Sequence, residues 1–153
     1  MAERLPRRVR EVLEDPRPLA DLLGKFHNEH RSTVLAIGQA SALFGDRKER
    51  ELGRTILDAH REYKDSLRKI RLLENASEEI KKGYLGWAYL KAWQMVRLAK
   101  MLAVPRAGPT PLELEQLEEE LAFYKPLAER FVKRAFTHRA KAKSIFNRLF
   151  EGV

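Results

Sequence analysis

The four histidines are the first residues to consider for catalysis or metal binding, because the chain has no cysteine. His27 and His30 lie three residues apart beside Glu29 and could share one metal ion. They lack the HExxH arrangement, and His30 falls in the apolar register of its helix, which favours a core histidine. No histidine follows a glutamate by three residues, the spacing that di-iron bundles require. We therefore expect no metal site, no cofactor and no catalytic residue.

A second candidate for chemistry is the pair Arg54 and His60, six residues apart. The pair resembles the Arg-x(4–6)-His signature of HEPN ribonuclease domains, which are also basic helical bundles, and the resemblance implies RNA cleavage. Within one continuous helix, however, a separation of six residues places two side chains about 120° apart. No Gly or Pro between them interrupts the helix, so we expect them not to converge on one phosphate. A HEPN-like ribonuclease is therefore the third alternative, and the chain is not expected to be an enzyme.

The strongest indication of function is a row of basic residues near the C-terminus. Residues 125–153 hold eight basic and two acidic residues, whereas residues 105–124 hold one basic and five acidic residues. At ~100° per residue the row falls on one helix face. With so few acidic neighbours it is suited to contact several phosphates of a nucleic-acid backbone, although a solvated surface face is the alternative. The row consists of Arg130, Lys133, Arg134, Lys141 and Arg148.

A second basic segment lies at the N-terminus. Residues 6–14 have a short helical pattern, and the Asp-Pro-Arg-Pro sequence at 15–18 ends it. Proline removes a backbone donor and restricts the residue before it. We therefore interpret residues 1–15 as an arm that is separable from the main body and whose arginines add phosphate contacts. These arginines are Arg4, Arg7, Arg8 and Arg10.

Two other groups of residues are interpreted as structural. Four arginines recur every seven residues from Arg47 to Arg68, and each of the first three has an acidic residue four positions later. This spacing predicts intrahelical ion pairs. Trp87 and Trp93 lie in the most apolar helix, which favours packing in the core over stacking on bases.

These side chains have to be positioned by helices, since helical periodicity is found almost throughout the chain and alternating strand patterns are not. We predict an all-α fold, a bundle of four to five long helices with a short basic N-terminal helical arm. The long helices are expected at about 18–44, 46–75, 77–104, 110–124 and 126–150, with a break or kink at Pro126. Small residues over 36–42 permit close approach of a neighbouring backbone.

The predicted organisation has four parts. They are the basic arm (1–15), a core helical bundle (16–104), a Pro-rich linker (105–111), and an acidic then basic helical region that packs on the bundle (112–153).

Composition limits the class of protein. The chain has 30 Lys and Arg against 22 Asp and Glu, a net charge of +8, which indicates a polyanionic partner. No apolar stretch approaches the ~20 residues of a membrane span, and the N-terminus lacks the apolar core of a signal peptide. We therefore expect a cytoplasmic protein, or a virion protein if it is viral, with no membrane partner. Scarce Asn and Gln with abundant Arg and Glu are typical of thermophilic proteins.

In its pattern of helices and charge, the chain resembles the coat proteins of filamentous viruses of thermophilic archaea. Those helical folds wrap double-stranded DNA through basic helices and an N-terminal arm. It also resembles the small helical subunits of CRISPR effector complexes, which line a nucleic-acid filament. These resemblances imply a structural nucleic-acid-binding protein in a homo- or hetero-oligomer, with the backbone of double-stranded DNA as the expected partner and no sequence reading.

The alternatives belong to other classes of protein. One is a protein-interaction adaptor, whose acidic helix (113–124) and basic helix (125–150) would contact different partners. The other is a small subunit of a ribonucleoprotein complex.

Overall fold

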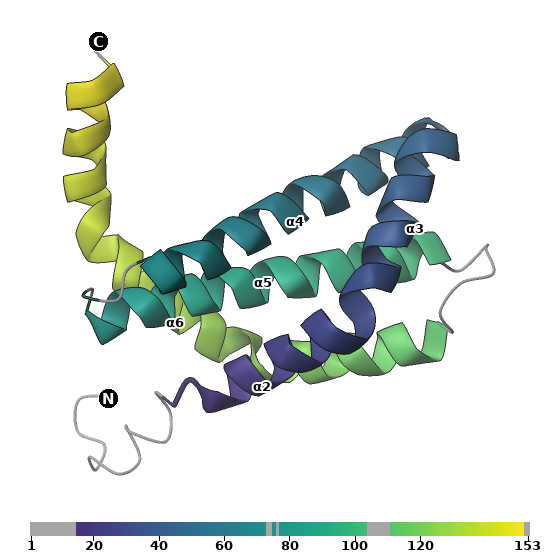
Figure 1. The fold of residues 1–153 in the computed structure, drawn as a ribbon, viewed down its shortest axis with the longest axis horizontal. Coiled ribbons are helices and arrows are strands. Elements are labelled where there is room, and N and C mark those ends of the chain that lie inside the picture. Colours follow the sequence, from purple (N-terminus) through teal and green to yellow (C-terminus); the bar gives the residue numbers. More distant parts are fainter. Residues whose placement is uncertain (1–14, 73–74, 76, 104–110, 152–153) are drawn as a thin grey trace.

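The described part of the chain is built from long helices that lie side by side (Figure 1). The computed structural model describes residues 15–72, 75, 77–103 and 111–151, and in the last helix it describes side chains as far as Phe136. Within these residues the fold is all-α, with four packed helices and no strand, so the predicted fold class is confirmed. The predicted arm and the Pro-rich linker lie almost entirely outside them. The elements are α2 (Arg17–Lys25), η2 (Phe26–His30), α3 (Arg31–Phe44), α4 (Arg47–Leu72), α5 (Glu78–Ala103) and α6 (Pro111–Glu151).

α2, η2 and α3 follow one another without a gap and form one bent helix, where the sequence predicted a single helix over residues 18–44. η2 is a π-helical turn, in which the Arg31 N–H donates to the Phe26 carbonyl five residues earlier. A π turn fits an extra residue into the helix and so changes the register of the residues that follow. Figure 1 shows α2 and α3 meeting at an angle. His30, which was expected in the core, is only partly buried, and its Nε2 lies 3.7 Å from a carboxylate oxygen of Glu29.

α3 and α4 pack closely because small residues meet between them. Gly38 and Ser41 of α3 are buried, as is Gly53 of α4. A Cβ atom on Gly53 would lie 2.6 Å from the Gly38 carbonyl oxygen and 2.7 Å from the Ala42 amide nitrogen, which is closer than Cβ atoms approach such groups. The predicted close approach of residues 36–42 to a neighbour is thus observed, and α4 of the same chain is that neighbour.

The two long hairpin helices begin at the predicted caps. At the start of α4 the Glu49 N–H donates to Asp46 Oδ1 at 2.9 Å, and the Asp46 N–H donates to Glu49 Oε1 at 3.2 Å. This is the reciprocal pattern of a capping box. α5 begins after Ser77, whose Oγ accepts a hydrogen bond from the Ile80 N–H at 3.4 Å. The caps fix where each helix starts and therefore which of its residues face inward.

α5 is the central helix, as its apolar sequence predicted. It packs against α4 and α6, and it also contacts α2 and α3. Ala88, Ala92 and Val96 are fully buried in it. Tyr89 is buried as well, and its hydroxyl donates to the backbone carbonyl of Leu121 in α6. Among the helices that the structure describes, none is long and apolar enough to cross a membrane.

α6 is one helix of 41 residues, so the predicted break into two helices at Pro126 is wrong. The helix does bend along its course, so that its C-terminal part runs in another direction than its first part (Figure 1). Proline usually ends or bends a helix because it cannot donate to the carbonyl four residues earlier, here that of Ala122. Ala122 and Pro126 are both exposed, so water can hydrogen-bond to the freed carbonyl. Leu127, Ala128 and Phe131 are buried, and their packing holds the helix beyond the proline. The last part of α6 extends past the other helices (Figure 1).

Candidate nucleic-acid interface

The predicted basic row begins on the outer side of α6. Arg130 and Lys133 are exposed, and neither forms an ion pair with another residue in the described ranges. Arg134 is also exposed and lines a hollow of about 340 Å³ beside Lys82 of α5. Because α6 is continuous across Pro126, these residues share one helix with its first, acidic half.

The other predicted contact residues have side chains outside the part of the chain that the structure describes. The α6 backbone is helical as far as Glu151, so Lys141 and Arg148 share a helix with Arg130. Their contact with nucleic acid stays a prediction. These residues are Arg4, Arg7, Arg8 and Arg10 of the arm, and Lys141 and Arg148 of α6.

The arginines of α4 are partly neutralised on their own helix. Arg47 pairs with the glutamate four residues later at 3.7 Å, as predicted. Arg61 and Arg68 instead pair with the aspartate three residues earlier, at 3.1 and 3.4 Å. Arg54 is exposed, whereas His60 is 9% exposed on another side of the helix. The two side chains therefore do not converge as the HEPN-like signature would require.

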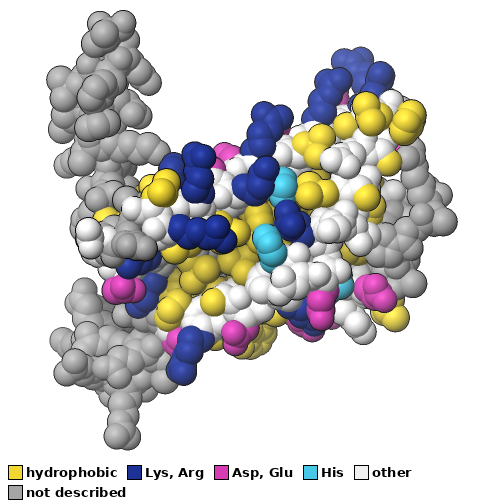
Figure 2. All heavy atoms as spheres, in the orientation of Figure 1, with side chains coloured by type: hydrophobic (Ala, Val, Ile, Leu, Met, Phe, Trp, Pro, Cys, Tyr) yellow, Lys and Arg dark blue, Asp and Glu magenta, His cyan; other side chains and the backbone are white. Residues whose placement is uncertain are grey.

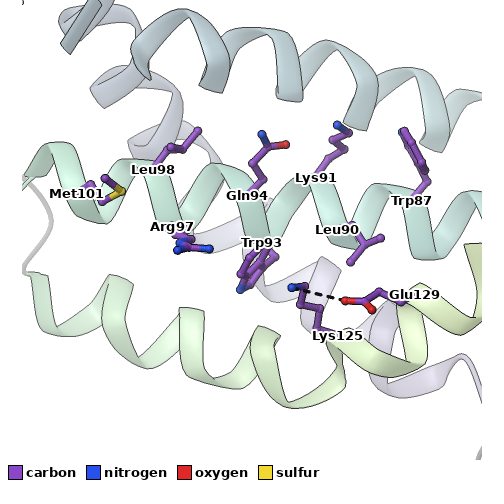
Figure 3. Close-up of a pocket in the computed structure, with 10 residues that line it drawn as sticks. All are labelled: Trp87, Leu90, Lys91, Trp93, Gln94, Arg97, Leu98, Met101, Lys125 and Glu129. Carbon is purple, nitrogen blue, oxygen red and sulfur yellow. Dashed lines mark ion pairs between the residues drawn. The ribbon is translucent and has the colours of Figure 1, made fainter. Parts of the chain in front are cut away.

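A groove of about 550 Å³ lies over α5, between α4 and α6 (Figure 3). In the close-up, Trp93 and Arg97 lie on the side of α5 that faces α6, where Lys125 projects toward them. Eight of the lining residues come from α5 and two from α6. They are Trp87, Leu90, Lys91, Trp93, Gln94, Arg97, Leu98 and Met101 of α5, and Lys125 and Glu129 of α6.

Cationic side chains lie against the rings of both tryptophans. Lys125 Nζ is 4.0 Å from the centroid of the Trp93 ring, and the guanidinium carbon of Arg97 is 5.3 Å from it. Lys91 Nζ is 5.2 Å from the centroid of the Trp87 ring. Cations within about 6 Å of an aromatic face are attracted by its negative charge. The groove thus alternates aromatic rings with positive groups, the pattern found in proteins that bind unpaired nucleic-acid strands.

The expectation that the tryptophans pack in the core is wrong for Trp87, which is 36% exposed. Trp93 is partly buried and packs against the core as expected, and its Nε1 has no hydrogen-bond partner in the described part of the molecule. The buried stripe of α5 is formed mainly by small residues such as Ala92 and Ala99. Because neighbouring helices approach closely over such residues, the larger indole rings are left at the margin of the interface.

The sequence does carry a signal for this groove. Trp87 and Lys91 are four residues apart, as are Trp93 and Arg97, and residues at this spacing lie together on a helix. The signal is therefore a tryptophan followed by a cation four residues later, and not the tryptophan alone. The third cation, Lys125, could not be found in this way because it comes from another helix.

The groove has a positive charge balance. Lys91 Nζ lies 2.7 Å from a carboxylate oxygen of Glu62 in α4, and Lys125 Nζ lies 3.5 Å from one of Glu129. Arg97 is exposed and has no ion-pair partner within the described ranges. Arg97 is therefore the cation of the groove that is most available to an incoming anion.

The described residues include no group of three or more His, Asp and Glu side chains that could hold a metal ion. Comparisons with protein families, with curated proteins and with solved structures found no match. The function of the chain is therefore inferred from its own residues, among which the groove has the most specific arrangement.

Proposed function

We propose that this chain is a structural nucleic-acid-binding protein that holds a strand against α5 and α6 as a subunit of a larger assembly. The groove is the observation that carries this proposal, because its tryptophans alternate with Lys91, Arg97 and Lys125. Aromatic rings stack on any base, and neighbouring cations neutralise phosphates. Binding of this kind depends on the backbone and the bases of the strand but does not read its sequence.

The aromatic lining favours a strand with unpaired bases over duplex DNA, which the charge pattern alone suggested. Bases in a duplex are stacked on one another, so an indole ring reaches them only where they are unpaired. Trp87 offers an exposed ring, and Trp93 lies about 9 Å further along the helix axis. Arg97 and Lys125 stand beside the Trp93 ring, and Lys91 beside the Trp87 ring, at positions suited to phosphates.

The basic row extends this surface beyond the groove. Lys125, Glu129 and Lys133 follow one another at four-residue steps, so they lie along one side of α6. Lys133 is exposed one turn beyond Glu129, which lines the groove, and Arg130 is exposed as well. A strand that leaves the groove along α6 would therefore continue over positive charge.

Exposed apolar side chains outside the groove support the proposed assembly. Leu43 and Phe44, at the end of α3, are 72% and 81% exposed, and Phe123 of α6 is 76% exposed. Adjacent exposed apolar residues are typical of protein contacts. Subunits joined through such contacts would present successive grooves to one strand, as in a virion coat or a small subunit of a ribonucleoprotein complex.

A protein-interaction adaptor is the second candidate, and the acidic first half of α6 favours it. Glu113, Glu115 and Glu119 are exposed there, and Leu112 beside them is 61% exposed. A basic partner protein would complement this face. A protein partner has no condensed counterion atmosphere to release, so such binding would change less steeply with salt than binding to a nucleic acid.

Anisotropy of a labelled single-stranded oligonucleotide, measured over a salt series, tests the proposal. Trp87→Ala should weaken binding about tenfold, because stacking on one base contributes ~1–3 kcal/mol. Arg97→Gln should lower the affinity and reduce the salt slope by ~0.7, the effect of one phosphate contact on a single strand.

Two matched controls separate the groove from general surface effects. Leu72→Ala removes an exposed apolar side chain at the end of α4, outside the groove, and Lys48→Gln removes an exposed cation at the start of α4. Both should bind the oligonucleotide like the wild type. Equal affinity of the wild type and all four variants would contradict the proposal, as would retention of a protein partner but no oligonucleotide.

A further inference from the structure

A second concentration of positive charge lies on the other side of α4 from the groove, where η2 and the start of α3 come near α4. We call it the His27–His60 cluster, after its two histidines. Figure 2 shows this face, with histidine side chains at its centre among Lys and Arg side chains. The members of the cluster are His27, Arg31, His60, Tyr63, Lys64 and Arg71.

Tyr63 is the centre of this cluster. Its side chain is 1% exposed, and its hydroxyl oxygen lies 2.8 Å from His27 Nδ1. The rings of His27 and His60 each stack beside the Tyr63 ring at a centroid distance of 6.0 Å. The π turn contributes to this arrangement, because His27 and Arg31 lie one wide turn apart and so on the same side of their helix. One buried tyrosine thus holds histidines from two helices.

The basic groups of the cluster repel one another, which disfavours further positive charge on the histidines. Burial, followed by the charges of Lys64 and Arg31, lowers the pKa of His60 to about 4. Burial, followed by the charges of Arg31 and Arg71, also lowers the pKa of His27. Arg31, Lys64 and Arg71 form no ion pair with any residue that the structure describes. The positive charge is therefore uncompensated by the neighbouring side chains.

Two nitrogen atoms of the cluster are buried without a hydrogen-bond partner among the described residues, Arg31 Nε and His60 Nε2. His60 is 9% exposed, so little of its side chain is hydrated in this conformation. A buried polar group that lacks a partner costs the free energy of its desolvation. An anion with several acceptor oxygens would supply the missing hydrogen bonds and offset the charge.

We propose that the His27–His60 cluster binds a phosphate group. Arg31 Nε donates to one phosphate oxygen, and His60 donates to another in the tautomer that carries its proton on Nε2. Lys64, at the exposed rim, offsets the charge. The phosphate belongs either to a phosphodiester of a bound strand or to a phosphate monoester, free or at a strand end; both offer the same acceptor oxygens.

This site is independent of the groove. Glu62, which pairs with Lys91 of the groove, is two residues from His60 and from Lys64 on α4. Two residues correspond to about 200° of helical rotation, so the cluster and the groove lie on opposite sides of this helix. Loss of one site should therefore leave the other intact.

Isothermal titration of the full chain with inorganic pyrophosphate at low salt tests the site. Arg31→Gln should weaken pyrophosphate binding at least tenfold, and Lys64→Gln, at an exposed position, should weaken it several-fold. Arg54→Gln removes an exposed arginine from another side of α4, the helix that carries Lys64, and should leave the affinity for pyrophosphate unchanged. Thermal unfolding shows whether each variant is folded. Equal affinity of the wild type and of the Arg31 and Lys64 variants, or an equal loss in the Arg54 variant, would overturn the proposal.

Oligonucleotides with a 5′-phosphate or a 5′-hydroxyl distinguish the two sources of phosphate. A monoester site binds the phosphorylated strand more tightly, and Arg31→Gln abolishes that difference. A diester site binds both strands equally, and Arg31→Gln weakens both. Affinities that Arg31→Gln leaves unchanged for both strands would also overturn the proposal. Trp87→Ala should weaken oligonucleotide binding but not pyrophosphate binding, so failure of the groove and failure of this site are distinguishable.

Discussion

Two buried tyrosines illustrate how single residues connect the helices. The Tyr89 hydroxyl donates to the Leu121 carbonyl, a fixed backbone acceptor, and burial raises the pKa of Tyr89. The Tyr63 hydroxyl instead meets the His27 ring, which can itself gain a proton, and burial raises the pKa of Tyr63 to about 12. Buried tyrosines usually need such a partner for the hydroxyl. One residue thus joins α5 to α6, and the other joins α4 to a titratable group.

The depressed pKa of His60 should make stability depend on pH. Its pKa falls from 6.5 in the unfolded chain to about 4 in the folded protein, so the unfolded chain binds more protons between these values. The free energy of unfolding is therefore highest above pH 6.5 and decreases as the pH falls. Between pH 7 and pH 5 we expect a loss of about 2 kcal/mol from this residue. Urea denaturation at a series of pH values measures it.

His60→Gln is the control for this pH dependence. The variant cannot gain a proton at this position, so its stability should fall less between pH 7 and pH 5. A ring-proton titration of His60 by NMR provides a second measurement that does not need the variant to fold. A normal pKa for His60 in the folded protein would show that this explanation is wrong.

At the scale of the elements, the helices are held together by close approach of their backbones. Gly53 allows α4 to approach α3, and Gly86 allows α5 to approach α6, where a Cβ atom would lie 2.6 Å from the Ala128 carbonyl oxygen. The same closeness leaves no room for large side chains in these interfaces. It explains why the indole rings of α5 lie at the margin of the core, where they border a groove.

We expect Gly53→Ala to lower the free energy of unfolding by about 2 kcal/mol or more, because the added methyl group meets backbone atoms that cannot move independently. Gly24→Ala is the matched control. A Cβ atom on Gly24, within α2, would have nothing within 4 Å. Since alanine favours a helix over glycine, the control should gain up to ~1 kcal/mol. Chemical denaturation compares the two, and destabilisation of the same size in both would contradict the packing argument.

The basic row on α6 is tested as one element. We expect a variant with glutamine at Arg130, Arg134, Lys141 and Arg148 to stay folded but to bind nucleic acid more weakly, with a smaller salt slope. Each phosphate contact that is lost reduces the slope by ~0.7 on a single strand or ~0.9 on duplex DNA. Affinity measured at several salt concentrations gives this slope.

The control for the row removes the same number of charges from α4. This control variant has glutamine at four exposed positions near the start of α4, which are Arg47, Lys48, Arg50 and Arg54. If this control variant loses as much affinity as the α6 variant, net charge and not the row governs binding.

At the scale of the whole molecule, the described fold presents two positive surfaces on opposite sides of α4. One is the groove of tryptophans and cations, and the other is the His27–His60 cluster. The groove is lined by α5 and α6, whereas the cluster is formed by η2, α3 and α4. α4 and α5 pack against each other between these two surfaces (Figure 1). The described residues thus place positive charge on these two surfaces and at the first residues of the basic row.

Removal of residues 1–14 tests the part of the chain that precedes the described fold. All buried apolar residues of the described core lie at Leu19 or beyond, so the melting temperature of the truncated protein should stay nearly unchanged. Loss of four arginines should weaken nucleic-acid binding or assembly. Calorimetry, oligonucleotide affinity and light scattering measure the three properties. A much lower melting temperature would place the arm in the core, and unchanged binding and assembly would show that it serves neither.

Local sequence signals were sufficient for the helices themselves. Asp46 with Glu49, and Ser77, predicted where α4 and α5 begin, because a cap acts within one turn of its own helix. The even spacing of apolar residues predicted which face of each helix is buried. The break predicted at Pro126 was wrong because the free-energy cost of a proline in a helix depends on whether the freed carbonyl is exposed to water. That exposure is a property of the folded molecule.

The sequence by itself therefore determined the fold class, the start of each main helix and the basic character of the chain. Only the tertiary structure decided which side chains meet. Lys125 of α6 lies over Trp93 of α5, and His27 of η2 contacts Tyr63 of α4. In each pair the two residues come from different helices. Periodicity states which face of a helix is apolar but not which helix will cover it. Both candidate sites arise at such meetings, and for this reason neither could be located before the helices were packed.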